Sequence, residues 1–449
     1  MHSAPKIKQF LPIFLLKLVH DPIDHMTDLQ KKYGDIFYKH FLGYDQYFIC
    51  HPAFAEHILS SNQTNYRKHP TLAQNFQYIL GENNLLATNN LTSWQRDRTL
   101  AQKVFEPDVF FEQYTQIVNN KCDQMFNQWQ TQYQKNPVPI THELSHLVLS
   151  IINDTIFQHL NLDIELMAQH IPEIFSLLRD RSLSLTNLLW LLPTPKRFRL
   201  QREIKFIQDA AKKALLSRFN ECRDYDDLLG ELLHDYQIKD DTHTHFTTVG
   251  YQTMTFNIVG FSSTLAALLW VFTHLALYPD ITDQMSEEIT TICENQQPTL
   301  AHVNQLTYTK AVISEILRLY PPLAFYLRQA ITNDQLGSYT LPANACVTVS
   351  PFHIHRHPDF WESPMTLNPE RFLSKPWGQD YQFAYIPFGA GQRSCIAKNF
   401  AMLEICLIVT MALQRFKFSL PKDFELKKTY IASVFLRPNL DIIFLRDRA

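Results

Sequence analysis

The sequence has few glycines and no large excess of charge of either sign. Only 10 of its 449 residues are glycine, and long stretches are compatible with helices, which is typical of a mainly helical protein. The formal net charge is −3, so the protein lacks the broad basic field that nucleic-acid-binding proteins use. We therefore expect no nucleic-acid partner.

The cysteines also lack a pattern. The chain has seven, an odd number, and they are spread without paired spacing. Small secreted proteins with a disulfide framework instead carry an even number of cysteines at regular short intervals. We expect free thiols in a reducing compartment and therefore a cytoplasmic location.

No segment is a convincing signal peptide or anchor. The N-terminal apolar segment 10–19 is interrupted by Pro12 and Lys17 and is about half as long as the roughly 20 residues that span a bilayer. It also lacks the basic start and the small-residue cleavage site of a signal peptide. We expect residues 1–20 to dock on the body of the protein, which then occupies residues 21–449.

A second apolar run, 258–277, contains no charged residue and is long enough to cross a membrane. It does carry several hydroxyl groups and a histidine, and no cluster of lysine or arginine flanks it. Helices that are apolar on every side also occur at the centre of large soluble proteins. We expect a buried helix and no integral membrane span.

The order of the remaining segments favours one large domain that is mainly α-helical with small β-sheets. Helical patterns dominate residues 93–294. The other elements that the sequence predicts are helices over 27–33, 308–320 and 396–413, strands over 36–41 and 46–50, and paired strands in the C-terminal tail.

The segment with the clearest chemistry is Phe388–Ala397, which reads FGAGQRSCIA. Gly389 and Gly391 allow a tight backbone bend. Cys395 follows the bend, at the expected start of the next helix, where the helix dipole and free N–H groups favour a thiolate. Arg393 precedes the cysteine by two residues and is placed to reach an anionic group beside a bound metal.

This segment resembles the haem-binding loop of the cytochrome P450 family, whose pattern is Phe-x-x-Gly-x-Arg-x-Cys-x-Gly. The positions that match are Phe388, Gly391, Arg393 and Cys395, while Ala397 replaces the last glycine. The resemblance implies the cytochrome P450 fold and a haem b whose iron is held by the Cys395 thiolate. Such a ligand pushes electron density onto the iron and assists O–O cleavage.

Two charged residues of the helix at 308–320 lie where that family expects a structural pair. Glu315 and Arg318 share one face at i and i+3, on a helix that is otherwise largely apolar. The segment Pro369–Phe372 resembles the family's later motif, and the resemblance implies that its Arg371 completes a buried Glu–Arg–Arg network around the cofactor.

Three further residues are implied as partners of the haem propionates. The segment from Trp94 to Arg98 resembles the family's Trp-x-x-x-Arg motif, and an indole N–H and a guanidinium at i and i+4 can both donate to one carboxylate. Arg328, which follows Pro321 and Pro322, resembles another propionate partner of the family.

The apolar run departs from the family's distal helix, whose signature is Ala/Gly-Gly-x-Asp/Glu-Thr-Thr. Gly260 matches, and its missing side chain would leave room beside the oxygen site. Ser262 stands in place of the acid and Ser263 in place of the first threonine. The acid–alcohol pair normally delivers protons, so we expect Ser263 to be the distal alcohol, with Thr264 as its competitor. These hydroxyl groups can also simply bond back to carbonyls four residues earlier in their own helix.

The resemblance implies a monooxygenase that inserts oxygen from O2 into a lipophilic small molecule, such as a fatty acid, a terpenoid or a steroid-like compound. Because the acid is missing, three possibilities remain open. A water chain or a carboxyl group of the substrate could supply the protons. Alternatively, the enzyme could use peroxide, or rearrange an oxygenated substrate, without a reductase. The residues expected to line the substrate pocket are Phe76, Tyr78, Phe175, Leu178, Phe256, Phe261, Phe325 and Tyr326.

The sequence contains no flavin or iron–sulfur region, so a separate electron donor of the ferredoxin or flavodoxin type is expected. A basic patch of Lys103, Lys121 and Lys398 is the candidate docking surface for it.

Functions of other classes remain open at this stage. A haem protein that binds ligands without turnover is one of them. Another is a non-haem metallohydrolase, because His353, His355 and His357 would alternate like metal ligands on one face of a strand.

Overall fold

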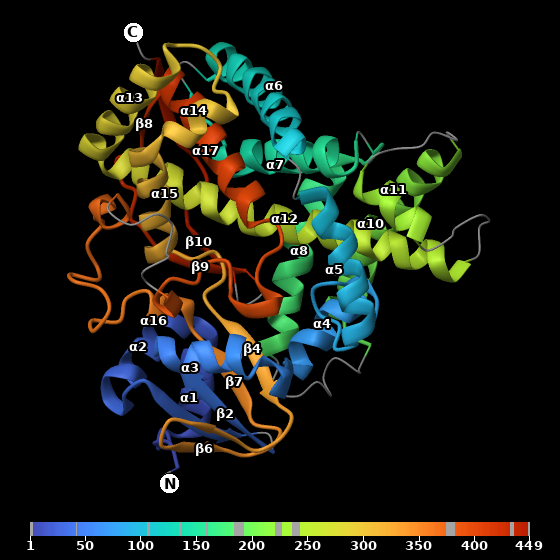
Figure 1. Cartoon of the computed structure of the whole chain (residues 1–449), viewed down its shortest axis with the longest axis vertical. Helices are drawn as coiled ribbons and strands as arrows, with labels where there is room; N and C mark the ends of the chain where they lie inside the picture. The colour runs from blue at the N-terminus through green and yellow to red at the C-terminus, as the bar shows by residue number, and fades with distance from the viewer. Residues whose placement is uncertain are drawn as a thin grey trace. The chain divides into compact units, whose positions relative to one another are not determined.

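The computed structural model of the chain describes residues 3–41, 43–105, 108–133, 136–158, 160–183, 193–220, 227–235, 243–373, 382–431 and 435–447. Two compact units alternate along the sequence. Unit 1 comprises Met1–Asn75, Ser314–Cys395 and Ser433–Leu436, and unit 2 comprises Phe76–Ile313, Ile396–Ala432 and Arg437–Ala449. The architecture is mainly α-helical with small sheets, as predicted (Figure 1).

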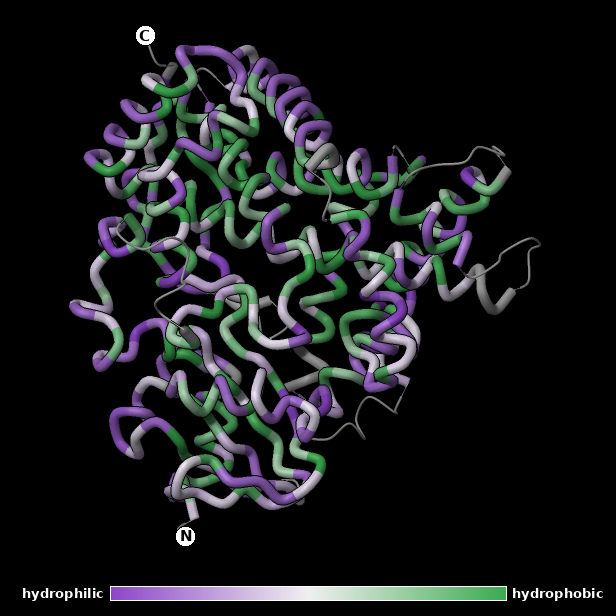
Figure 2. The backbone as a smooth tube through the Cα atoms, viewed as in Figure 1, coloured by the Kyte–Doolittle hydropathy of each residue, from purple (hydrophilic) through white to green (hydrophobic). Residues whose placement is uncertain are grey.

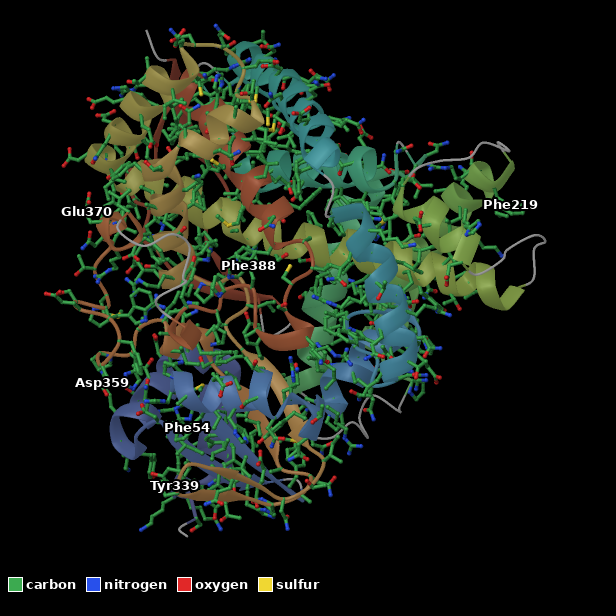
Figure 3. The ribbon with its side chains drawn as sticks, in the orientation of Figure 1. Phe54, Phe219, Tyr339, Asp359, Glu370 and Phe388 are labelled. Atoms are coloured by element: carbon green, nitrogen blue, oxygen red, sulfur yellow. The ribbon has the colours of Figure 1, made fainter. Side chains whose placement is uncertain are left out.

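Unit 1 is built on a five-stranded sheet in the order β1-β2-β7-β4-β3, in which β2 and β7 run parallel and the other neighbours antiparallel. The strands of this sheet are β1 (Ile36–Phe41), β2 (Tyr44–Ile49), β3 (Tyr66–Lys68), β4 (Tyr326–Ala330) and β7 (Cys346–Val349). Strands β5 (Asp334–Leu336) and β6 (Tyr339–Leu341) of the same unit form a separate two-stranded sheet. Its helices include α1 (Leu11–His20), α2 (Pro22–Tyr33), α3 (Pro52–Glu56) and α16 (Pro351–Ile354), and β-branched and aromatic side chains fill the core between them and the sheet. Phe54 and Tyr339, labelled in Figure 3, are part of this packing, with ring centroids 6.3 Å apart.

The N-terminal segment docks on the sheet of unit 1, as its interrupted apolar pattern predicts. Ile7 donates its backbone N–H to the Tyr38 carbonyl at 2.8 Å. Ala4, Ile7 and Phe14 are buried, so the segment adds to the core rather than extending away from it.

Unit 2 is largely a helical assembly. Its helices are α5 (Leu91–Phe105), α6 (Asp108–Gln132), α7 (Ile140–Ile156), α8 (Ile164–Leu183), α10 (Pro195–Asn220), α11 (Leu228–Asp235), α12 (His243–Leu277), α13 (Pro279–Cys293), α14 (Leu300–Gln305) and α17 (Lys398–Arg415). Antiparallel strands β8 (Phe416–Ser419) and β11 (Phe444–Asp447) form one small sheet, and β9 (Lys428–Ile431) pairs with β10 (Phe435–Pro438). Helices α4 (Pro70–Leu80) and α15 (Thr307–Leu319) and strand β10 cross the sequence boundaries of the units.

The long apolar helix α12 packs against α7, α10, α13 and α17, and green hydrophobic segments recur through the helical part of the chain in the hydropathy colouring of Figure 2. Its segment Thr247–Leu277 is long and apolar enough to cross a membrane, but 83% of its most apolar window is buried inside the protein. The prediction of a buried core helix is confirmed.

One predicted strand is wrong. Residues 353–357 do not alternate along a strand, because Pro351–Ile354 forms the short helix α16 followed by a turn. Pro351 stands at the first helical position, and the Ser350 side chain accepts from the His353 backbone N–H at the cap. Both are start signals for a helix, and the sequence-based expectation of a strand overlooked them.

Candidate functional site

Cys395 closes a tight loop in unit 1. Its backbone N–H donates to the carbonyl of Phe388, labelled in Figure 3, at 2.8 Å. Gly389 and Gly391 have φ of +73° and +67°, the left-handed region that favours glycine. A Cβ on Gly391 would lie 1.8 Å from the Leu59 carbonyl oxygen, so no other residue fits there without moving the backbone.

The Cys395 side chain differs from the other thiols. It is exposed, whereas the other five cysteines that the structure describes are buried, and none of these six forms a disulfide bond. Helix α17 begins at Lys398 with Ala397 as its N-cap, so Cys395 precedes the helix rather than starting it as predicted. The loop therefore presents one accessible sulfur atom on a backbone that glycine geometry holds in place.

A half-buried tyrosine and a buried histidine hold the segment that leads into this loop. The Tyr326 hydroxyl donates to the Ile386 carbonyl at 2.8 Å, and His355 Nε2 accepts from the Ile386 N–H at 2.8 Å. Burial raises the pKa of Tyr326 and lowers the pKa of His355 to about 3, so both groups stay neutral. The sequence predicted Tyr326 as a pocket residue and missed this supporting role.

The predicted Glu–Arg–Arg network is present in unit 1. Arg318 donates to both carboxylate oxygens of Glu315, from Nε at 2.7 Å and from Nη2 at 2.8 Å, and both residues are fully buried. Arg371 Nε lies 3.3 Å from Glu315 Oε1. His355 Nδ1 lies 3.1 Å from the Arg318 carbonyl, so this histidine links the network to the segment that precedes the cysteine loop.

Three cations of unit 1 gather near one another. Lys68 on β3 lies directly opposite Arg328 on β4, and burial followed by the charges of Arg328 and Arg393 lowers the pKa of the Lys68 ammonium well below its usual range. Burial lowers the pKa of Arg328 to about 10. Like charges directly opposite each other destabilise a strand pair, so this cluster suits an anionic ligand with more than one negative group.

Lys68 was missed by sequence reasoning. It lies beside the predicted site residue Arg328 because β3 pairs with β4, which joins two segments far apart in the chain. No local pattern around residue 68 signals that pairing.

In unit 2, one stripe of α12 is partly exposed. Among residues 252–272, all of which the structure describes, every residue is buried except Phe256, Val259, Gly260 and Ser263. Their spacing of three, four and seven residues places them on one face of the helix. Ser262 and Thr264 lie off this stripe and are buried, which favours Ser263 among the three predicted hydroxyl residues.

The hydroxyl groups of α12 bond within the helix. Ser262 Oγ donates to the Ile258 carbonyl at 2.7 Å and Ser263 Oγ to the Val259 carbonyl at 2.9 Å. Gly260 has a packing role that the sequence did not suggest, because a Cβ there would lie 3.1 Å from the Ile152 side chain of α7. Its missing side chain thus allows α7 and α12 to approach.

A sequence profile described as Cytochrome P450 matches residues 3–446 of the chain. The chain belongs to the cytochrome P450 family. The family consists of haem-thiolate oxidoreductases, in which a cysteine thiolate is the axial ligand of haem b.

Three of the curated relatives to which this P450 is similar are bacterial enzymes. The pentalenene oxygenase of Streptomyces avermitilis is 24% identical over 93% of this chain and 92% of its own. The cyclooctatin synthase of Streptomyces melanosporofaciens is 26% identical over 83% and 80%, and the cyclooctat-9-en-7-ol 5-monooxygenase of the same organism is 30% identical over 53% and 52%.

The residues of unit 1 fit a haem of this P450. The accessible sulfur of Cys395 is the donor type that the family uses, and the cluster of Lys68, Arg328 and Arg393 provides positive charge for two propionates. Lys68, the last residue of β3, lies opposite Arg328 in the middle of β4, and Arg393 lies two residues before the cysteine.

The predicted propionate motif of unit 2 has the expected local geometry. Trp94 is buried, and the Arg98 guanidinium lies 5.5 Å from its ring on the same face of α5. Next to them, buried Asp97 accepts a hydrogen bond from Gln252 Nε2, which ties α5 to α12. Contact of Trp94 and Arg98 with a propionate stays a prediction.

Two other predictions are wrong in this P450. The nitrogens of His353, His355 and His357 do not converge on a metal, since each ring contacts a different neighbour. The basic patch is also largely neutralised, since Lys103 lies 3.3 Å from Glu231 and Lys121 lies 2.5 Å from Asp154.

Proposed function

We propose that this P450 is a monooxygenase of polycyclic terpenoids that takes its electrons from a separate protein. The observation that carries the proposal is the accessible Cys395 sulfur on a glycine-shaped loop of the same unit as the Lys68–Arg328–Arg393 cluster. With haem bound, the iron centre supplies reductive activation of O2 and transfer of one oxygen atom to a C–H bond.

The chain's own residues supply binding, orientation and proton handling. Cys395 holds the iron, and the three cations of unit 1 orient the propionates, with Trp94 and Arg98 as the proposed contribution of unit 2. The Glu315 network and the Tyr326 and His355 hydrogen bonds keep the cysteine loop rigid, because each removes a way for the loop to move.

Ser263 is the proposed distal alcohol. Its hydroxyl proton is directed to the Val259 carbonyl, so the lone pairs of Oγ remain free to accept a hydrogen bond from a water molecule at the oxygen site. A water held in this way replaces the missing acid as the local proton source. Ser262, which takes the acid's position in the sequence, is directed to the Ile258 carbonyl and lies off the accessible stripe.

The substrate class rests on two lines of support. The accessible stripe of α12 consists of Phe256, Val259, Gly260 and Ser263 and has no charged side chain, so it suits a hydrocarbon better than a fatty-acid carboxylate. Relatives of this chain are named for pentalenene, cyclooctat-9-en-7-ol and 11-oxo-beta-amyrin, which are polycyclic terpenoids.

The first experiment tests the cofactor ligand. The reduced protein with carbon monoxide should give the red-shifted band of thiolate-bound haem. Cys395→His should move that band to the position of histidine ligation. An unmoved band in the variant would overturn Cys395 as the ligand.

The second experiment tests substrate and oxidant together. Pentalenene and palmitic acid are offered to the holoenzyme with a ferredoxin, its reductase, NADPH and ¹⁸O2, and in parallel with H2O2. A terpenoid product carrying ¹⁸O, with no palmitate product, supports the proposal. Product formed with H2O2 alone would favour the peroxide-using alternative, and palmitate oxidation alone would overturn the terpenoid assignment.

The proposed location is the cytoplasm, and the proposed electron donor is a ferredoxin or a flavodoxin. The six cysteines that the structure describes form no disulfide bond, which suits the reducing cytoplasm, and fractionation of the source cells checks this. A ferredoxin-type and a flavodoxin-type donor can be compared by the rate of haem reduction, and a rate that does not depend on salt for either would argue against an electrostatic docking surface.

A further inference from the structure

A cluster of two histidines and two glutamates lies in unit 2, away from the accessible stripe of α12. Residues 142–146 of α7 read His-Glu-Leu-Ser-His. The spacing of four places His142 and His146 on one helix face, and their ring centroids are 4.5 Å apart. Glu165, in the first turn of the neighbouring helix α8 (Figure 1), brings its Oε2 to 3.1 Å from His146 Nε2.

The donor atoms are close to the arrangement of a metal site. One nitrogen of each histidine and one oxygen of Glu165 all lie within 4.8 Å of one another. In a tetrahedral zinc site with bonds of about 2.0–2.1 Å, neighbouring ligand atoms are separated by about 3.4 Å. Since His142 and Glu165 are mostly exposed, small side-chain rotations close the remaining difference.

His146 Nε2 provides a separate indication. The atom is buried and, despite its 3.1 Å approach to Glu165, has no partner with hydrogen-bond geometry among the described residues. A buried nitrogen lone pair without a donor is unfavourable, and a cation held between the imidazole and the carboxylate would satisfy both.

Glu143 lies behind the cluster and takes a different role. Its Oε2 accepts from Trp129 Nε1 at 2.9 Å, and its Oε1 lies 3.5 Å from His142 Nδ1. A carboxylate beside Nδ1 stabilises the tautomer whose Nε2 lone pair can bind a metal. In metallohydrolases with the His-Glu-x-x-His motif this glutamate is the general base. Because Trp129 holds it here, we expect metal binding without hydrolysis.

The cluster borders a cavity of about 810 Å³ that is lined by residues of unit 2. Phe175, Phe261 and Ser262 line it together with the three ligand candidates. The cavity thus lies on a different face of α12 from Ser263 and leaves space for a water molecule as fourth ligand.

We propose that His142, His146 and Glu165 bind one Zn²⁺ ion with water in the fourth position and thereby fasten α8 to α7. Nitrogen and carboxylate donors at this spacing suit zinc and similar transition-metal ions, and not Mg²⁺, which prefers oxygen ligands in an octahedral arrangement.

A second group of possible ligands in the described part of the chain serves as a contrast. Asp35, His51 and His357 of unit 1 also lie close together. Nδ1 of His51 and Nδ1 of His357 each accept a backbone N–H, from Ala53 and from Asp359. That places the ring proton of each neutral histidine on Nε2, which then has no lone pair for a metal.

The test uses the holoenzyme, stripped with a chelator and dialysed against micromolar Zn²⁺, with zinc per chain measured by atomic emission. Wild-type protein should retain one Zn²⁺ per chain. His146→Gln and Glu165→Gln should each weaken binding at least tenfold. Glu143→Gln should weaken it by about tenfold, because the carboxylate beside His142 Nδ1 is lost. His51→Gln is the matched control and should bind as wild type does. Mg²⁺ in excess should not compete.

The thiolate carbonyl band of each variant, measured on the same samples, reports that the haem site is intact. It also separates failure of this proposal from failure of the proposed function, because zinc binding does not require turnover. No zinc retained by wild-type protein, or equal zinc in wild type and in a His142→Gln/His146→Gln double variant, would overturn the proposal. Loss of zinc in His51→Gln alone would place the ion at the other group and overturn it equally.

Discussion

Removing either arginine of the Glu315 network should destabilise the protein, but by different amounts. Arg318 makes two bonds to the Glu315 carboxylate and also donates to the carbonyls of His355, Pro364 and Thr366. Arg371 makes a single, longer contact of 3.3 Å with the same carboxylate. Arg318→Ala therefore leaves a fully buried carboxylate with only one peripheral cation, whereas Arg371→Ala leaves the two shorter bonds in place.

The expected magnitudes follow from this difference. Breaking a buried ion pair costs about 3–5 kcal/mol, which we expect for Arg318→Ala. Losing one hydrogen bond to a charged group costs about 1.5–3 kcal/mol, which we expect for Arg371→Ala. Arg318→Lys keeps the positive charge but loses most carbonyl bonds, so it should fall between wild type and Arg318→Ala.

Urea unfolding of the holoenzyme, followed by tryptophan fluorescence and by the haem absorbance, measures these effects. Arg318→Ala should shift the unfolding midpoint further than Arg371→Ala at equal slope. If the two alanine variants were equally stable, or Arg371→Ala were the less stable, the assignment of Arg318 as the main partner of Glu315 would be wrong.

Three further predictions concern other buried or strained groups. Burial raises the pKa of Glu404 from 4.5 to about 8. The folded state therefore holds the Glu404 proton more tightly than the unfolded state does. The contribution of this group to stability is complete below pH 4.5 and is lost as the pH rises to 8. Glu404→Gln should thus gain stability over wild type that grows across that range to about 3–5 kcal/mol, and identical urea midpoints at all pH values would contradict this. Gly391→Ala should lose haem and the carbonyl band because its Cβ meets the Leu59 carbonyl. Gly34 has open space around it, and its φ of +86° and ψ of −159° form a conformation that is nearly exclusive to glycine, so Gly34→Ala should cost only about 1–3 kcal/mol and keep the carbonyl band. Loss of the band in both variants would refute the steric argument. Ser263→Ala should lower product formation about tenfold or more and raise peroxide release. Ser263→Thr keeps a hydroxyl group and should therefore couple oxygen consumption to product as wild type does, and Ser262→Ala should change little. If Ser262→Ala had the larger effect of the two alanine variants, the distal role would belong to Ser262.

The sequence alone determined the features that depend on local chemistry. The loop from Phe388 to Cys395 was identified because tight bends require glycine at set positions and a thiolate ligand requires cysteine. Helix ends were also local, since Gly34 ends α2 and Pro321 follows α15. The buried nature of α12 followed from an apolar run without flanking charge.

Sequence patterns gave a wrong prediction where a strand-like alternation directly followed two signals for the start of a helix. The alternating histidines at 353–357 suggested a strand, but Ser350 and Pro351 begin a helix there. The basic patch failed for another reason: Glu231 and Asp154, which pair with two of its three lysines, come from other helices.

Only the tertiary structure decided which distant residues act together. Lys68 joins Arg328 through strand pairing, and Glu165 meets the two histidines of α7 because α7 and α8 pack side by side. The choice of Ser263 over Ser262 likewise depended on which face of α12 other elements cover. A sequence shows which residues are capable of a chemistry, because that depends on the side chain and its neighbours in the chain. It does not show which of them meet, because packing between distant segments sets their distances.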